Sequence, residues 1–178
     1  FNRLEVKNAF VNKVLQDTAN YIDITTNFKN DEITYDVRLQ HFYVHDKSVY
    51  IVDGKHVKFD YSREELNIAY WINQVFGYEV ILVPKVNFPK KINTPDFIIN
   101  KERWDLKTIT SSSNQALYHA VYGKNKQSNN FILDLSKSKL DFNEIINQLK
   151  RIYEREDTNF VNKIIIKKNK IYKVFKRK

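Results

Sequence analysis

The hydrophobic pattern changes its period twice along the chain. Residues 4–20 carry apolar side chains near helical spacing, which predicts a helix. Residues 21–60 instead contain short pieces rich in Tyr, Ile and Val, typical of antiparallel strands separated by polar turns. These pieces are ITYDVRL, HFYVHD, SVYIVD and HVKFD. Asp53-Gly54 favours a hairpin turn between the last two. We therefore assign residues 1–59 to an N-terminal α+β extension or linker subdomain.

From Ser62 onward, helical and strand patterns alternate. Ser62 and Glu65 form a capping-box pair, so a helix should begin there and end near Phe76, before Gly77. The apolar run YEVILVP at 78–84 predicts a strand near the centre of a sheet. A basic loop, KVNFPKKIN, follows it.

The rest of the chain continues this alternation after a hairpin at 94–110. The expected elements are a short helix (ALYHAVYGK) behind the N-cap-like serines Ser111–Ser113, a strand (FILDLS), an amphipathic helix at 141–156 and a closing hairpin that turns near Asn169. Helix, strand, hairpin, helix, strand, helix, hairpin predicts an α/β domain over residues 60–178. We expect a mixed central sheet flanked by helices.

The hairpin at 94–110 concentrates the charged side chains of interest. A two-residue turn at Asn100-Lys101 would pair Phe97 with Trp104 and Asp96 with Asp105. One face then carries the aromatic pair and Leu106. The other face carries the two aspartates with Lys107 beside them. Like charges opposite each other destabilise a sheet, so we expect a cation between the two carboxylates.

The helix that begins at Ser62 contributes a third acid. At 100° per residue, Glu65 falls roughly 20° from the centre of the apolar stripe around Ile72, so it should point inward. The alternative is that Glu65 only reaches back to Ser62 as the capping-box glutamate. Both roles are compatible, because the first turn of a helix often lies at the rim of a site.

Together these residues indicate phosphodiester hydrolysis. Asp96 and Asp105 supply the hard oxygen ligands that Mg²⁺ or Mn²⁺ prefers, and Glu65 could complete the metal shell. Such an ion activates water and neutralises charge in the transition state. Lys107 could orient the water or stabilise the pentacovalent phosphate. The catalytic candidates are therefore Glu65, Asp96, Asp105 and Lys107.

Further candidates lie around this hairpin. Lys124, Lys126 and Gln127 follow the next helix and could contact phosphates of a nucleic acid. The alternative is a solvated helix end. The hydroxyl of Thr108, with those of the nearby serines, could meet a phosphate at a helix N-terminus.

Charge and composition favour a polyanionic partner. The net charge is +9, while the absence of cysteine excludes disulfides, thiol nucleophiles and cysteine-ligated zinc. No apolar run approaches the ~20 residues that a membrane span needs. The chain begins at Phe1, so we expect it to be a piece of a longer polypeptide.

The acids and the lysine, read as Glu65…Pro95-Asp96…Asp105-Leu106-Lys107, resemble the E…PD…(D/E)xK motif of the PD-(D/E)xK nucleases. The predicted order of elements fits the α-β-β-β-α-β core of that restriction-endonuclease-like fold. Residues 60–178 resemble more closely the C-terminal nuclease domain of CdiA-type contact-dependent inhibition toxins. The resemblance rests on the segments REELNIAYWINQVFGYEVILVP, NTPDFIIN, RWDLKTIT and NNFILDLSKSKL.

The resemblance implies a metal-dependent endonuclease with Mg²⁺ or Mn²⁺ as cofactor and tRNA as the favoured substrate. It further implies delivery by a larger secreted or surface protein into the cytoplasm of a target bacterium, and a cognate immunity protein as partner. Two alternatives stay open. One is a DNase of the same fold, and the other is a non-catalytic nucleic-acid-binding or phage-head-associated module.

Overall fold

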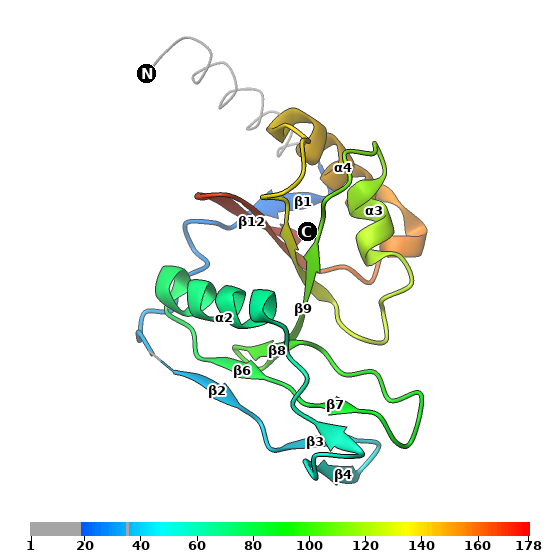
Figure 1. Cartoon of the computed structure of the whole chain (residues 1–178). Coiled ribbons are helices and arrows are strands. Elements are labelled where there is room, and N and C mark those ends of the chain that lie inside the picture. The colour runs from blue at the N-terminus through cyan, green and yellow to red at the C-terminus, as the bar shows by residue number, and fades with distance from the viewer. Residues whose placement is uncertain (1–18, 35) are drawn as a thin grey trace.

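An eight-stranded mixed sheet runs through the computed structural model, which describes residues 19–34 and 36–178 (Figure 1). The strand order is β1-β12-β11-β10-β9-β8-β6-β2. The bounds are β1 Tyr21–Asp23, β2 Val37–Leu39, β6 Val80–Leu82, β8 Phe97–Ile99, β9 Glu102–Thr108, β10 Asn130–Asp134, β11 Lys163–Lys168 and β12 Ile171–Arg177. Strands β9, β10 and β11 are parallel, whereas the hairpins β8–β9 and β11–β12 are antiparallel. The predicted mixed α/β fold is confirmed.

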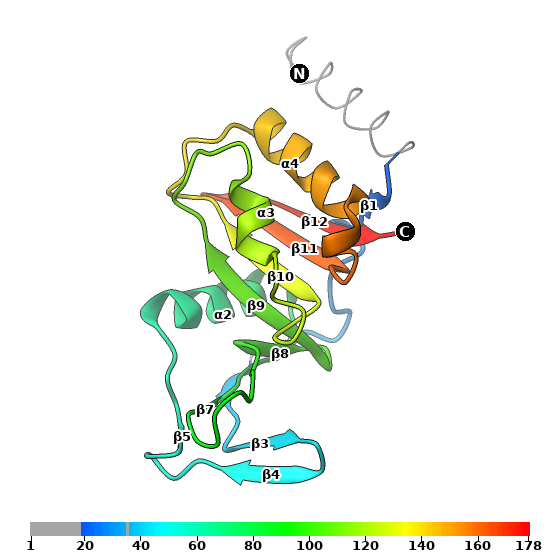
Figure 2. The ribbon, with the colours of Figure 1, turned by 90° about the vertical axis from the view of Figure 1, so that its right-hand side faces the viewer.

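Helices cover both faces of this sheet (Figure 2). They are α2 Arg63–Phe76, α3 Ala116–Val121 and α4 Phe142–Glu154, followed by the 3₁₀ turn η1 Glu156–Thr158. Along β10, Phe131 is buried with Leu117 of α3 and Leu149 of α4, whereas its neighbour Ile132 is buried with Ile72 of α2. Successive side chains of a strand point to opposite faces, so the sheet separates two apolar cores.

The helix ends follow the local sequence signals. Ser62 Oγ accepts a hydrogen bond from the Glu65 amide at 3.0 Å, and Glu65 Oε2 accepts one from the Ser62 amide at 3.3 Å. Gly77 ends α2 in the left-handed region at φ 75°. Asp141 and Glu144 form a second capping box at the start of α4. The capping box and the end of α2 are therefore confirmed.

The β8–β9 hairpin has the predicted register. Phe97 pairs with Trp104, and both are buried on the α2 side of the sheet. Asn100 and Lys101 have φ angles of 51° and 64°, the conformation of a two-residue hairpin turn. The closing hairpin likewise turns at Asn169, with φ 55°.

Two expectations about strand pairing are wrong. Strand β6 lies next to the edge strand β2 rather than at the centre, and its apolar run is buried because α2 packs on it. Asp53-Gly54 does not join two paired strands. The strand before it, β4 (Ser48–Ile51), pairs with β3 (Phe42–His45), and the strand after it, β5 (Val57–Lys58), pairs with β7 (Lys85–Val86).

The side chain of Asp53 explains this departure. Its Oδ1 accepts hydrogen bonds from the amides of Lys55, His56 and Val57 at 2.8, 2.7 and 3.0 Å. These bonds close a compact turn over the residues that would otherwise continue a ladder with β4.

The N-terminal part contributes to the main sheet through β1, which pairs with β12, and through β2, which pairs with β6. The division of the chain at residues 59 and 60 stays a prediction. The helix expected at 4–20 falls almost entirely outside the described residues. Within that span, the structure describes only Ala19 and Asn20. Within the described ranges, no helix is long and apolar enough to cross a membrane.

Candidate active site

The carboxylates of Asp96 and Asp105 are each held by a backbone amide of the opposite strand at the open end of the β8–β9 hairpin. The amide of Asp96 donates to Asp105 Oδ1 at 3.0 Å, and the amide of Leu106 donates to Asp96 Oδ2 at 2.8 Å. These bonds continue the hairpin one step beyond the Phe97–Trp104 pair. Each carboxylate therefore has one oxygen fixed by the opposite strand and a second oxygen, Asp96 Oδ1 or Asp105 Oδ2, left for other partners.

Two lysines lie on these second oxygens. Lys107 Nζ is 3.3 Å from Asp105 Oδ2, and Lys85 Nζ is 2.8 Å from Asp96 Oδ1. The side chains of Asp105 and Asp96 are only 4% and 12% exposed, so these ion pairs lie in a largely desolvated place. Lys107 therefore lies beside the aspartates as expected, and Lys85 adds a second ammonium group, whereas a cation between the two carboxylates stays a prediction.

Lys85 is the site residue that the sequence did not reveal. It was expected in a basic loop, but it lies in β7, and β7 is placed by its pairing with β5. The only local signal is a lysine next to the apolar run that ends at Pro84. Its acidic partner follows eleven residues later, and nothing in the local pattern predicts their contact.

Electrostatics connect Glu65 to the aspartates. Burial, and then the charge of Asp96, raise the pKa of Glu65 to about 7, against opposition from Lys85. Burial and Asp96 also raise the pKa of Asp105, which Lys107 opposes. Burial lowers the pKa of Lys85, but the nearby Asp96 more than offsets this, so the pKa is raised overall. Glu65, from α2, thus shares one electrostatic environment with the hairpin acids while also capping its helix.

The donor set can be compared with the needs of a divalent cation. Mg²⁺ is commonly bound by one or two carboxylates, with water and substrate phosphate completing its shell. Asp96 and Asp105 supply two such carboxylates side by side. Over residues 19–34 and 36–178, however, no three His, Asp or Glu side chains are grouped closely enough to hold a metal ion. Two carboxylates meet the smaller requirement of Mg²⁺ or Mn²⁺, and both the cation and Glu65 as a third direct ligand stay predictions.

Arg103 connects this hairpin to the loop after α3, which contains the predicted phosphate-binding residues Lys124, Lys126 and Gln127. Its guanidinium donates to the carbonyl oxygens of Gln127 at 2.9 Å, Lys126 at 3.2 Å and Asn93 at 3.1 Å. Arg103 is two residues before Asp105 in β9, so both side chains project from the same face of the strand. The loop that follows α3 is therefore fastened beside the segment that leads into Asp96. Lys124 belongs to the same turn, because its carbonyl accepts from the Gln127 amide at 3.0 Å.

Thr108 is placed differently. It is the last residue of β9, exposed and opposite Asp134 of β10, at the end of the strand away from Arg103. The N-cap of α3 is Gln115, which makes no side-chain capping bond, so the expected serine cap is wrong. Ser113 Oγ instead accepts from the Gln115 amide at 3.1 Å. A role for Thr108 in nucleic-acid binding stays a prediction.

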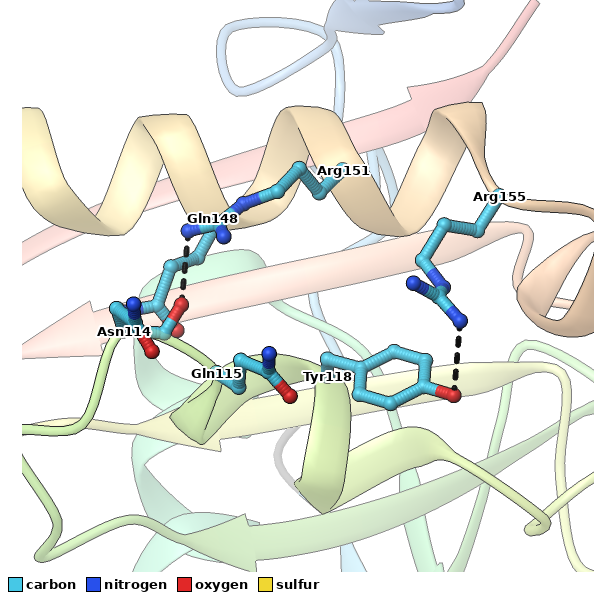
Figure 3. A pocket seen from close by; sticks show the side chains of 6 residues that line it. All are labelled: Asn114, Gln115, Tyr118, Gln148, Arg151 and Arg155. Atoms are coloured by element: carbon cyan, nitrogen blue, oxygen red, sulfur yellow. Dashed lines mark hydrogen bonds between the residues drawn. The ribbon is translucent and has the colours of Figure 1, made fainter.

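A small pocket of about 40 Å³ lies between α3 and α4 (Figure 3). Glu65, Asp96 and Asp105 are not among its lining residues. Its lining residues are Asn114, Gln115, Tyr118, Gln148, Arg151 and Arg155. Several of these groups bind each other or nearby backbone: Arg155 donates to the Tyr118 hydroxyl at 3.2 Å, and Gln148 Nε2 donates to the Ser113 carbonyl at 2.9 Å. These hydrogen bonds connect α4 and the residue after it to α3 and the residues before it. The hairpin acids therefore form the better candidate site.

Comparison with known families bears on the same hairpin. Residues 93–171 match the contact-dependent growth inhibition CdiA C-terminal domain. The matched segment contains Asp96, Asp105 and Lys107, whereas Glu65 and Lys85 precede it. A solved structure described as a CdiA-CT/CdiI toxin and immunity complex from Burkholderia pseudomallei is similar at 18% identity and a TM-score of 0.44, covering 78% of this chain and 98% of that chain. None of the curated proteins matches.

Glu65→Gln is expected to stabilise the protein at pH 8 but not at pH 4. A folded-state pKa near 7, against an ordinary value of 4.5, means that the folded protein holds a proton that the unfolded chain releases between these values. The stability of the wild type therefore falls as pH rises from 4.5 to 7. Glutamine carries no charge and can still cap Ser62. Since Glu65 is half-buried, solvent screening reduces the gain to about 1 kcal/mol.

Urea unfolding of both proteins in EDTA, at pH 4 and pH 8, measures this difference. Glu64→Gln, a change at the exposed neighbour in the same helical turn, is the matched control and should show no such pH-dependent gain. Equal stability of the Glu65→Gln protein and the wild type at pH 8 would contradict the prediction.

Proposed function

We propose that this domain is a metal-dependent nuclease that acts as the C-terminal toxin domain of a bacterial contact-dependent inhibition system. The observation that carries the proposal is the Asp96–Asp105 pair, held by reciprocal backbone hydrogen bonds with a lysine on each outer oxygen. This pair lies within the segment that matches the CdiA C-terminal domain. Apart from β7, which pairs with β5 outside the main sheet, the order α2, β6, β8, β9, α3, β10 also agrees with the core of the PD-(D/E)xK nucleases.

The residues of the chain suit the hydrolysis of a phosphodiester. Asp96 and Asp105 would hold Mg²⁺ or Mn²⁺, which when bound lowers the pKa of water and neutralises phosphate charge. Glu65, whose pKa is about 7 without a metal and would fall beside a bound cation, can accept the proton of the attacking water at neutral pH. Lys107 places a positive charge where the negative charge of the pentacovalent phosphate develops. The water oxygen bonds to phosphorus, one ester P–O bond breaks, and the products are an alcohol and a phosphate monoester.

We propose RNA, and tRNA in particular, as the substrate. The net charge of +9 supports a polyanion, and the loop containing Lys124 and Lys126 lies beside the hairpin, where it can contact phosphates. The choice of tRNA rests on the similarity to the CdiA toxins. On the same basis we propose action in the cytoplasm of a target bacterium, delivery by a larger surface protein and inhibition by a cognate immunity protein.

Incubation with total tRNA and with plasmid DNA, in Mg²⁺ and then in EDTA, tests the function. We expect cleavage of tRNA that stops when EDTA removes the metal. Nicking of the plasmid alone would replace the proposal with a DNase of the same fold. Binding of nucleic acid without cleavage, unchanged by Asp105→Ala, would leave a non-catalytic binding module.

A further inference from the structure

Lys85 lies among the site acids Glu65, Asp96 and Asp105, called the acid cluster below, but it comes from an element outside the nuclease motif. Strand β7, which carries it, pairs antiparallel with β5, where Lys58 is opposite Lys85 and Val57 is opposite Val86. Val57, Val83 and Val86 are buried in one small apolar cluster. The amide of Val83 also donates to the Asp96 carbonyl at 3.1 Å. Packing and hydrogen bonding on both sides of Lys85 therefore fix its backbone next to Asp96.

The ammonium of Lys85 lies on the carboxylate oxygen that an incoming cation would use. Asp96 Oδ2 is already bound to the Leu106 amide, so Asp96 Oδ1 is the outward oxygen, and Lys85 Nζ is 2.8 Å from it. An ammonium and a divalent cation compete for the same lone pairs, and their positive charges repel each other. Charge repulsion therefore favours movement of the Lys85 ammonium away from Asp96 Oδ1 when a cation occupies this oxygen.

A displaced Lys85 ammonium would remain in the site. The lysine side chain has a flexible four-carbon stem, and its head can move several ångströms while the backbone stays fixed. Its side chain is 27% exposed, so it has a path toward solvent, where the substrate phosphate would arrive. On the other aspartate, Lys107 occupies the equivalent outward oxygen. The two lysines thus flank the carboxylate pair.

We propose that Lys85 is a second phosphate-binding lysine of this site. Its ammonium pairs with Asp96 while no metal is bound. When a divalent cation occupies the carboxylate, the ammonium moves and binds a non-bridging oxygen of the substrate phosphate. The inference rests on the proposed nuclease function. It also gives β5, which lies in the N-terminal extension, a role in placing a substrate-binding residue.

Lys85→Met is the informative variant, because methionine keeps most of the apolar stem and removes the charge. Lys163→Met is the matched control: Lys163, on β11, is also an ion-paired lysine of low exposure, its Nζ lies 2.7 Å from Glu102 of β9, and it has no place in the site. Mn²⁺ affinity is measured by electron paramagnetic resonance of the free ion. Cleavage of total tRNA and of plasmid DNA is measured at saturating Mn²⁺.

The expected result combines tighter metal binding with weaker catalysis. Loss of the competing charge should lower the Mn²⁺ dissociation constant of Lys85→Met about tenfold, while cleavage at saturating Mn²⁺ falls tenfold or more. Lys163→Met should match the wild type in both measurements. Lys85→Arg keeps the positive charge and should restore wild-type Mn²⁺ affinity and part of the cleavage. Circular dichroism verifies that each variant is folded.

The outcomes separate this inference from the proposed function. Unchanged or weaker Mn²⁺ binding by folded Lys85→Met would overturn the inference. Removing a lysine that only orients Asp96 would leave the Mn²⁺ affinity unchanged or lower it. Full cleavage by Lys85→Met, beside an inactive Asp105→Asn, would overturn the inference alone. Absence of Asp105-dependent cleavage in the wild type would overturn the proposed function and the inference together.

Discussion

Asp105→Asn is expected to lower nucleic-acid cleavage about a hundredfold to a thousandfold while the protein stays folded. Asparagine retains an oxygen that can accept the Asp96 amide, so the hairpin closure should survive. The second oxygen, now 3.3 Å from Lys107, becomes an amide nitrogen. That group carries no negative charge, cannot bind Mg²⁺, and leaves Lys107 without its partner. Initial rates of tRNA cleavage in Mg²⁺ measure the loss.

Asp134→Asn is the matched control for this change. Asp134 ends β10, the neighbouring strand of the same sheet, and its carboxylate accepts from Ser136 rather than from a member of the acid cluster. Its substitution should leave the cleavage rate near that of the wild type. Equal rates for Asp105→Asn and Asp134→Asn would remove Asp105 from the reaction.

Trp104→Ala is expected to lower the free energy of unfolding by about 3–5 kcal/mol. The indole is 1% exposed, pairs with Phe97 across the hairpin, and lies with its ring centroid 5.8 Å from that of Phe28. Its removal would leave a large cavity between the sheet and α2. Because the aromatic pair sits directly before the Asp96–Asp105 pair, the same change should also loosen the site.

Trp104→Phe should be much milder. It keeps an aromatic ring and removes the indole N–H, which is buried without a hydrogen-bond partner among the described residues. A buried unsatisfied donor costs about 1–3 kcal/mol, so its loss offsets part of the smaller volume. Urea unfolding, followed by circular dichroism and the fluorescence of the remaining Trp71, measures both variants.

Tyr70→Ala serves as the control for these tryptophan substitutions. Tyr70 is 50% exposed on α2, and its removal should change the free energy of unfolding by about 0.5 kcal/mol or less. If Trp104→Ala cost no more than Tyr70→Ala, the aromatic face of the hairpin would not be part of the core.

Local signals in the sequence were sufficient for the hairpin and the helix ends. A two-residue turn fixes strand register, and a capping pair fixes a helix start within four residues, so Phe97–Trp104 and Ser62–Glu65 could be placed by spacing alone. The alternation of side chains then placed the aspartates and Lys107 on one face of the hairpin. These features depend on residues close together in the chain.

Long-range pairing was not accessible in the same way. The short β5–β7 ladder joins residues nearly thirty positions apart, and two-residue strands leave almost no periodic pattern. The site of Lys85 depends on that ladder, so the sequence could not connect Lys85 with Asp96. The same reason explains the misplacement of β6, because burial by α2 produces the same apolar run as a central position in a sheet.

The two backbone hydrogen bonds that hold Asp96 and Asp105 across the hairpin also constrain how this chain can change over evolutionary time. Each acid is held by the main chain of the other strand, so inserting a single residue into either strand segment between an acid and the turn would shift one carboxylate out of register and release both at once. Lengthening is tolerable only beyond the strands, in the bend itself. Homologous chains should therefore vary in loop length at residues 100 and 101 while keeping the strand segments on either side intact.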